Sequence, residues 1–96
     1  MTHAELQELI VTRCRDLGHW YYAPQESFRS QPGWVDLVII SRKGGHLFVE
    51  LKSDAGRRTR PQMHVAELLQ RAGLEYRLWR PEDWMGAKIE RELVEL

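Results

Sequence analysis

The strongest constraint on the fold comes from two apolar segments, Trp34–Ile40 and Leu47–Leu51, which flank the polar stretch 41–46. Both segments are rich in β-branched and large apolar residues, a composition typical of strands. Two strands separated by a short polar stretch with the pair Gly44-Gly45 predict a β-hairpin. Because side chains alternate along a strand, both faces of each segment are apolar, which indicates a sheet covered by helices on both sides.

Helical and strand patterns on either side of the hairpin predict the rest of the fold. The predicted elements are, in order, a helix over His3–Leu17, a strand over 19–22, the two hairpin strands, a helix over Thr59–Ala72, a strand over Leu74–Trp79 and a final helix after Pro81. The order α-β-β-β-α-β-α predicts an α/β fold with a mixed β-sheet flanked by helices. Residues 1–96 contain no repeat or linker, so we expect one domain.

Length and composition suit a small globular protein. The chain has 96 residues, of which 43% are hydrophobic and 29% charged. A domain of this size has little surface for extended binding, so we expect a second subunit to extend it and the protein to be a homodimer. Cys14 is the only cysteine, the N-terminus has no signal-peptide pattern, and no apolar run has membrane-spanning length. We therefore expect a soluble cytoplasmic protein with no membrane partner.

Overall charge does not argue for a nucleic-acid partner, because 14 basic and 14 acidic residues give a net charge of zero. Basic residues are nevertheless clustered at Arg57, Arg58 and Arg60, directly before and at the start of the second predicted helix. Helix N-termini favour anions, so these arginines are candidate contacts to DNA phosphates. Arg29, in the loop before Gly33, is a further candidate. Solvated loop charge is an equally good explanation of each cluster.

Three charged residues interrupt the apolar strands. Asp36 lies in the first hairpin strand, and Glu50 and Lys52 lie at the end of the second, where alternation puts them on one face. An unpaired carboxylate inside a covered sheet is costly, so the two acids require a compensating charge. A hard divalent cation such as Mg²⁺ provides it, because it prefers carboxylate oxygens and keeps waters for chemistry. The pattern predicts a metal site.

This hypothesis places a condition on the hairpin. Directly opposite residues of an antiparallel pair point to the same face, so Asp36 must lie opposite Glu50 or Lys52. An odd-length loop satisfies the condition, for instance Lys43-Gly44-Gly45 with Arg42 opposite His46, and so does a compensating bulge. A two-residue turn at Gly44-Gly45 without a bulge would separate the acids.

Phosphodiester hydrolysis needs charge neutralisation at the phosphate, an activated water and help for the leaving oxygen. Two carboxylates and a lysine match these needs. We assign Asp36 and Glu50 as metal ligands, the Leu51 carbonyl as a third ligand, and Lys52 to orienting water or stabilising the charge on the phosphate.

The motifs Gly33-x-x-Asp36 and Glu50-x-Lys52, followed by Gly56 and Gln62, resemble the PD-(D/E)XK nuclease superfamily and its VRR-NUC branch. The resemblance extends from Thr2 to about Trp84. It implies a restriction-endonuclease-like fold, dependence on Mg²⁺ or Mn²⁺, and structure-selective cutting of branched or junction DNA. It also implies a homodimer with two active sites. Small stand-alone members of the branch occur in phages and bacteria.

Position by position, Asp36, Glu50 and Lys52 match the catalytic motif, and Gln62 matches a helix glutamine beside the metal site. Gln62 also has a purely structural explanation, because Thr59-x-x-Gln62 is a capping box. Two positions depart from the pattern. Val35 replaces the usual proline, and His3 stands where many members have a glutamate on the first helix. Either His3 takes over part of that role or the enzyme works with fewer acidic groups.

Two alternatives to an independent nuclease remain open. The first is a nuclease-fold module that binds nucleic acid without cutting it, although such degenerate members typically lose the acids or the lysine that this chain retains. The second is a subunit activated by a helicase, a terminase or another DNA-processing partner. The sequence contains no evident base-reading element, so little sequence specificity is expected.

Overall fold

The computed structural model describes residues 1–24 and 31–96. Its elements follow in the order α1 (His3–Leu17), β1 (Trp20–Tyr22), β2 (Leu37–Ile40), β3 (His46–Leu51), α2 (Arg60–Arg71), β4 (Tyr76–Trp79), α3 (Pro81–Met85) and α4 (Lys88–Glu95). This order confirms the predicted α/β fold, with the region after Pro81 divided into two helices. Arg29, a predicted DNA contact, lies outside the described residues.

The strands form a mixed four-stranded sheet in the order β1-β2-β3-β4. The β1–β2 and β2–β3 pairs are antiparallel, and β3 and β4 are parallel. Parallel neighbours need a crossover connection, and α2 lies in that connection. As a result, β3 and β4 end at the edge of the sheet where β2 begins.

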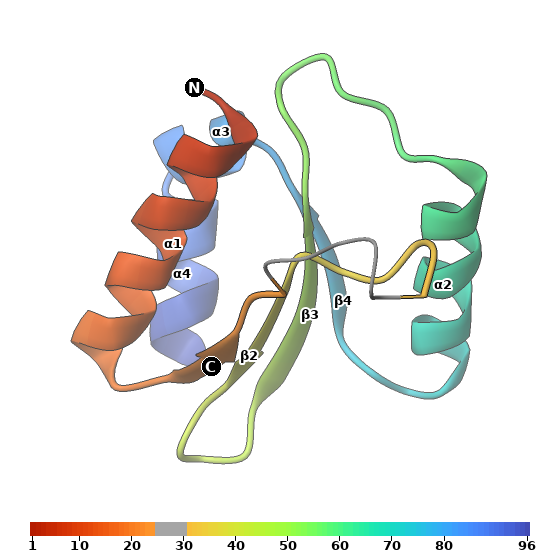
Figure 1. Cartoon of the computed structure of the whole chain (residues 1–96). Helices are drawn as coiled ribbons and strands as arrows, with labels where there is room; N and C mark the ends of the chain where they lie inside the picture. Colours follow the sequence, from red (N-terminus) through yellow and green to blue (C-terminus); the bar gives the residue numbers. More distant parts are fainter. Residues whose placement is uncertain (25–30) are drawn as a thin grey trace.

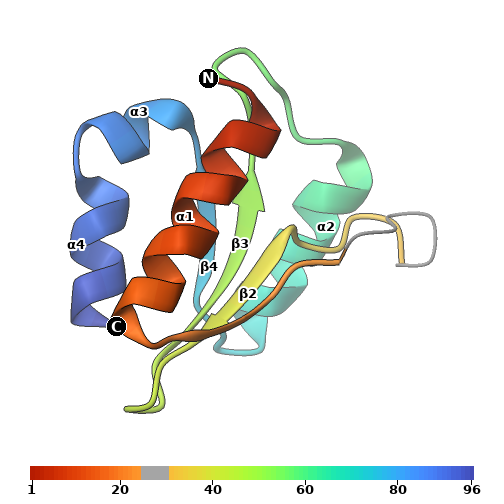
Figure 2. The same cartoon turned by 60° about the vertical axis from the view of Figure 1, so that its left-hand side comes forward.

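Helices cover both faces of the sheet, as the apolar strands predict. Figures 1 and 2 show α1 and α4 on one face and α2 on the other. The first layer buries side chains such as Leu6, Ile10 and Leu93 against Leu37 and Val49. The second and smaller layer packs Ala66 and Leu69 of α2 against the opposite face. Within the described residues, no helix has the length and apolar composition that crossing a membrane requires.

The hairpin has the odd-length loop that the two acids require. Leu37 lies opposite Val49 and Ile40 opposite His46, so the loop is the odd-length stretch 41–45. The particular loop Lys43-Gly44-Gly45 is not the one formed. The Ser41 hydroxyl accepts from Gly45 N at 3.0 Å, and Ser41 N donates to Gly45 O at 2.8 Å. His46 therefore lies opposite Ile40 and not Arg42, a register shift of two residues.

The predicted strand Trp34–Ile40 is shorter in the structure, because its first part bends before β2 begins. Alternation from Trp34 predicts Val35 on the same face as Leu37 and Ile39, and this is wrong. Val35 packs with Val38 in the α2 layer, whereas Leu37 and Ile39 pack in the α1 layer. The strand alternation therefore holds only from Leu37 onward.

The final helix is interrupted at Gly86 and Ala87. Ala87 is the only residue other than glycine with positive φ among the described residues, at 62°. Glycine is a poor helix former, and a left-handed residue cannot continue a right-handed helix. The break divides the region into α3 and α4, and α4 then packs Ile89 and Leu93 against the sheet.

Candidate active site

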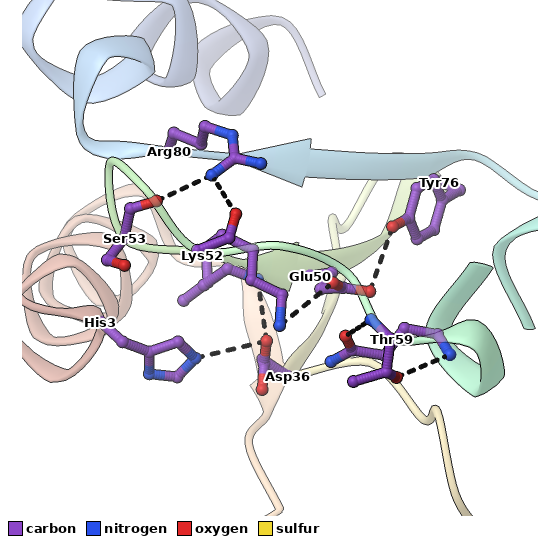
Figure 3. Close-up of polar contacts among 11 residues, drawn as sticks. His3, Asp36, Glu50, Lys52, Ser53, Thr59, Tyr76 and Arg80 are labelled. Atoms are coloured by element: carbon purple, nitrogen blue, oxygen red, sulfur yellow. Dashed lines mark hydrogen bonds and ion pairs between the residues drawn. The ribbon is translucent and has the colours of Figure 1, made fainter.

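Asp36 directly precedes β2, at the sheet edge where β3 and β4 end. The strand pairing begins at Leu37, which lies opposite Val49, and Asp36 bends directly before it, close enough to Glu50 for their charges to interact. Asp36 N donates to Val49 O at 2.9 Å, and Asp36 Oδ2 accepts from the Leu51 backbone N–H at 2.8 Å. The end of β3 thus holds both the backbone and the carboxylate of Asp36 (Figure 3).

Glu50 is the most deeply buried acid of the site, with only 1% of its surface exposed. Its Oε1 accepts a hydrogen bond from the Tyr76 hydroxyl at 3.2 Å. Its Oε2 is buried and has no hydrogen-bond partner among the described residues. Burial, and to a smaller degree the charge of Asp36, raise the pKa of Glu50, against the opposing effects of Lys52, Tyr76 and Arg58. An unpartnered buried oxygen of this kind is unusual and suits a cation.

Lys52 follows β3 and supplies the nearest positive charge. Its Nζ lies 3.8 Å from Glu50 Oε2, and its side chain is 18% exposed. Lys52 N donates to Trp79 O at 3.1 Å, which continues the parallel pairing past the end of both strands. The ammonium therefore lies beside the acidic pair and remains within reach of a ligand from solvent.

Arg80 holds the loop that follows Lys52. Its Nη1 donates to Ser53 O at 2.8 Å and to Gly56 O at 2.7 Å. A Cβ on Gly56 would lie 3.1 Å from Ser53 Oγ and 3.4 Å from Lys52 Cδ. The close packing around this loop restricts where the Lys52 side chain can lie. Spacing did not single out Arg80, because its contacts are to backbone carbonyls of a distant loop.

The structure brings His3 to the acidic pair. Its Nε2 lies 3.4 Å from Asp36 Oδ2. A capping box between Thr2 and Glu5 starts α1 at His3, and this start places the imidazole over the sheet edge. At 3.4 Å the contact is longer than a strong hydrogen bond, and His3 remains 45% exposed.

Gln62 takes part in the capping box of α2 and also borders the acidic site. Its Oε1 accepts from Thr59 N at 2.8 Å, and its own N–H donates to Thr59 Oγ1 at 3.2 Å, so the predicted capping box is present. Gln62 also lines a pocket of about 190 Å³ together with Asp36, Gly33 and Trp34. Its oxygen serves the cap, and its amide NH₂ makes no hydrogen bond within residues 1–24 and 31–96.

The predicted phosphate contacts at the start of α2 differ in burial and in their effect on the acidic site. Arg57 and Arg60 are exposed at the start of α2. Arg58 is half-buried and lowers the pKa of both Glu50 and the Tyr76 hydroxyl, although burial leaves the Tyr76 pKa above its ordinary value. Of these arginines, Arg58 faces the acidic site and the other two face solvent.

Comparisons with known proteins identify the fold. No family model and no curated protein matches the chain. A solved structure described as a VRR_NUC domain matches with a TM-score of 0.68 and 24% sequence identity, covering 81% of this chain and 84% of that chain. The chain has the fold of a VRR_NUC domain. The fold implied by the motif resemblance is therefore confirmed.

Within this VRR_NUC fold, the predicted ligands can be tested against the needs of a metal ion. No group of three or more His, Cys, Asp or Glu side chains in residues 1–24 and 31–96 is arranged to hold a metal. Mg²⁺ commonly uses one or two carboxylates and takes its other ligands from water and substrate phosphates. Asp36 and Glu50 fit that mode of binding, because Glu50 Oε2 lies near Lys52 without a hydrogen-bond partner in the described residues while Tyr76 holds Oε1.

Sequence reasoning missed Tyr76 as a member of the site. Tyr76 lies opposite Phe48 in the parallel pair, so it shares a face with Phe48 and Glu50. The strand β4 was predicted, but its place beside β3 was not. Without that neighbour, nothing in the local sequence connects Tyr76 with Glu50.

Proposed function

We propose that this protein is a metal-dependent nuclease that hydrolyses DNA phosphodiester bonds. The observation that carries the proposal is the buried Glu50 carboxylate. One of its oxygens has no hydrogen-bond partner within the described residues, a lysine lies at 3.8 Å, and a second acid, Asp36, is held at the end of the same strand. The VRR_NUC fold supports the same reaction class by analogy. Mg²⁺ or Mn²⁺ is the proposed cofactor.

Asp36 and Glu50 would hold the ion, with the Leu51 carbonyl as a further ligand. When bound, the ion supplies charge neutralisation at the scissile phosphate and lowers the pKa of a coordinated water. Lys52 holds a proton beside the acids and is placed to orient the attacking water or to stabilise negative charge on the phosphate. The NH₂ group of Gln62 would donate to the same phosphate, because the cap engages only the side-chain oxygen.

DNA would approach over the start of α2, where Arg57, Arg58 and Arg60 add positive charge to the helix N-terminus. Contacts of this kind bind the phosphate backbone of DNA and do not read its base sequence. We therefore propose little sequence specificity. Selectivity for branched or junction DNA, and a homodimer that presents two active sites, rest on the resemblance to the VRR-NUC branch.

The test measures cleavage of labelled linear, flapped and four-way-junction DNA in Mg²⁺, in Mn²⁺ and in EDTA. Asp36→Ala and Lys52→Ala should each abolish metal-dependent cleavage. Asp16→Ala and Lys43→Ala serve as matched controls, since both are exposed and lie away from the acidic pair. They should cleave at the wild-type rate.

Other results would redirect the proposal. Retained DNA binding by a folded protein without cleavage in any metal would favour a binding module. Cleavage that appears only after a helicase or terminase is added would favour a partner-activated subunit. Equal cleavage by wild type and Asp36→Ala would point to a contaminating nuclease and reject the assigned site.

A further inference from the structure

The Tyr76 hydroxyl makes a contact that the folding of β4 alone does not require. Tyr76 is 8% exposed, in the layer between the sheet and α2. Its hydroxyl donates to Glu50 Oε1 at 3.2 Å, and both residues of the pair are buried. A phenylalanine would fill the same apolar space without this hydroxyl, so the hydroxyl itself calls for an explanation.

The two carboxylate oxygens of Glu50 have different surroundings. Oε1 is engaged by Tyr76, whereas Oε2 has no hydrogen-bond partner in the described residues and lies 3.8 Å from Lys52 Nζ. Asp36 shows a similar division, because its Oδ2 accepts from the Leu51 N–H. In each carboxylate, one oxygen is anchored to the protein. Figure 3 shows Tyr76 and Lys52 on opposite sides of the Glu50 carboxylate.

The anchors differ in how easily they can be altered. The Asp36 oxygen is held by a backbone amide at the end of β3, which no substitution except proline removes. The Glu50 anchor is a side chain on the neighbouring strand. Without it, the buried carboxylate would have neither oxygen hydrogen-bonded, and it would rotate or take up a proton to reduce that cost.

We infer that Tyr76 is a positioning residue that fixes the Glu50 carboxylate with Oε2 free for a divalent cation. The inference rests on the proposed metal-dependent function and adds a specific role to a residue outside the motif. Partners of this outer kind orient ligands, and their loss typically weakens metal binding by about 10–100-fold. Arg58 interacts electrostatically with both Tyr76 and Glu50.

The experiment measures Mn²⁺ binding to the purified, metal-free protein by isothermal titration calorimetry. Tyr76→Phe should weaken the dissociation constant by about 10–100-fold while the circular dichroism spectrum stays unchanged. Tyr22→Phe is the matched control, because it removes a hydroxyl from a 51% exposed tyrosine on β1. Its affinity should equal that of the wild type. Glu50→Gln should bind Mn²⁺ least.

The outcomes separate this inference from the proposed function. If wild type binds Mn²⁺ and Glu50→Gln does not, but Tyr76→Phe binds as tightly as wild type, the positioning role is rejected and the metal site stands. If wild type itself shows no Mn²⁺ binding, the metal-dependent function is rejected and the positioning role with it.

A second measurement keeps the test valid if Tyr76→Phe does not fold. The chain has three tyrosines, so ring-carbon NMR signals can be assigned in wild type by comparison with Tyr21→Phe and Tyr22→Phe. The Tyr76 Cζ signal should shift during a Mg²⁺ titration, with the dissociation constant that the same calorimetric titration gives when Mg²⁺ replaces Mn²⁺. A Tyr76 signal that stays unmoved at saturating Mg²⁺ would overturn the inference.

Discussion

The backbone amide of Leu51 donates a hydrogen bond to Asp36 Oδ2 at 2.8 Å, so the last residue of β3 orients the acid that precedes β2. The contact holds a carboxylate at the start of β2, beside the end of β3. It also means that Asp36 has a structural role, as a hydrogen-bond acceptor, beside its proposed role as a metal ligand. These roles can be separated by substitution.

Asp36→Asn retains an acceptor oxygen for Leu51 N and removes the charge. We expect its free energy of unfolding to stay near that of wild type, while Mn²⁺ binding and DNA cleavage are lost. Asp36→Ala leaves the Leu51 amide unpartnered and should cost about 1–3 kcal/mol in addition. Urea denaturation and calorimetry measure the two effects. Cleavage by Asp36→Asn at the wild-type rate would refute the ligand role.

Glu50 predicts a pH dependence of stability. Burial raises its pKa in the folded protein above the ordinary value of 4.5, so the folded state retains this proton to higher pH than the unfolded state. Between the pKa of Glu50 in the unfolded state and its pKa in the folded state, the folded protein binds more protons. The free energy of unfolding therefore falls as pH rises through the folded-state pKa. Glu50→Gln should lack this decrease.

At neutral pH, the metal-free Glu50→Gln protein should consequently be more stable than wild type. Added Mg²⁺ should stabilise wild type by mass action and leave Glu50→Gln unaffected. Denaturation curves from below 4.5 to neutral pH, with and without Mg²⁺, give both comparisons. A variant that is less stable than wild type throughout would contradict the raised pKa.

Arg80→Ala removes the two hydrogen bonds to the loop that follows Lys52. Hydrogen bonds from a charged donor contribute about 1.5–3 kcal/mol, so we expect a loss of stability of that order. Freeing the loop should also lower kcat, because Lys52 is then less restricted. Arg91→Ala, an exposed arginine of α4, is the control. An unchanged kcat would limit Arg80 to a structural role.

Gly33 and Gly44 provide a matched pair of substitutions, since both have positive φ, 88° and 91°. A Cβ on Gly33 would lie 2.3 Å from Pro61 O, whereas nothing lies within 4 Å of one on Gly44. Gly44→Ala should cost only the left-handed conformation, about 1–2 kcal/mol. Gly33→Ala should cost clearly more, because it also displaces the loop from α2. Thermal unfolding that ranks them in reverse would contradict the packing.

Gln62→Glu separates the helix-capping role of this residue from its role beside Asp36. Glutamate also completes a capping box, so stability should be unchanged within about 0.5 kcal/mol. The substitution removes the NH₂ donor from the pocket that Gln62 shares with Asp36 and adds a negative charge there. We expect reduced cleavage with an unchanged melting temperature. Full activity would leave Gln62 with the capping role alone.

The sequence by itself determined the local elements and the identity of the charged motif. Thr2 and Thr59 cap α1 and α2 through their own side chains, and Gly18 ends α1 in a left-handed conformation of φ 77°. Capping and periodicity depend on residues within a few positions, so they can be predicted from sequence. The same locality placed Glu50 and Lys52 together at the end of a strand.

Tertiary structure alone decided which distant residues share the site. The parallel pairing of β3 with β4 brings Tyr76 to Glu50, and Arg80 reaches the loop after Lys52 from the end of β4. The bend at Asp36 moves Val35 to the α2 layer against strict alternation. Which strands become neighbours and where the chain bends depend on packing over the whole chain. The residues within a few positions of Tyr76 or Arg80 therefore do not reveal which distant residues they will contact.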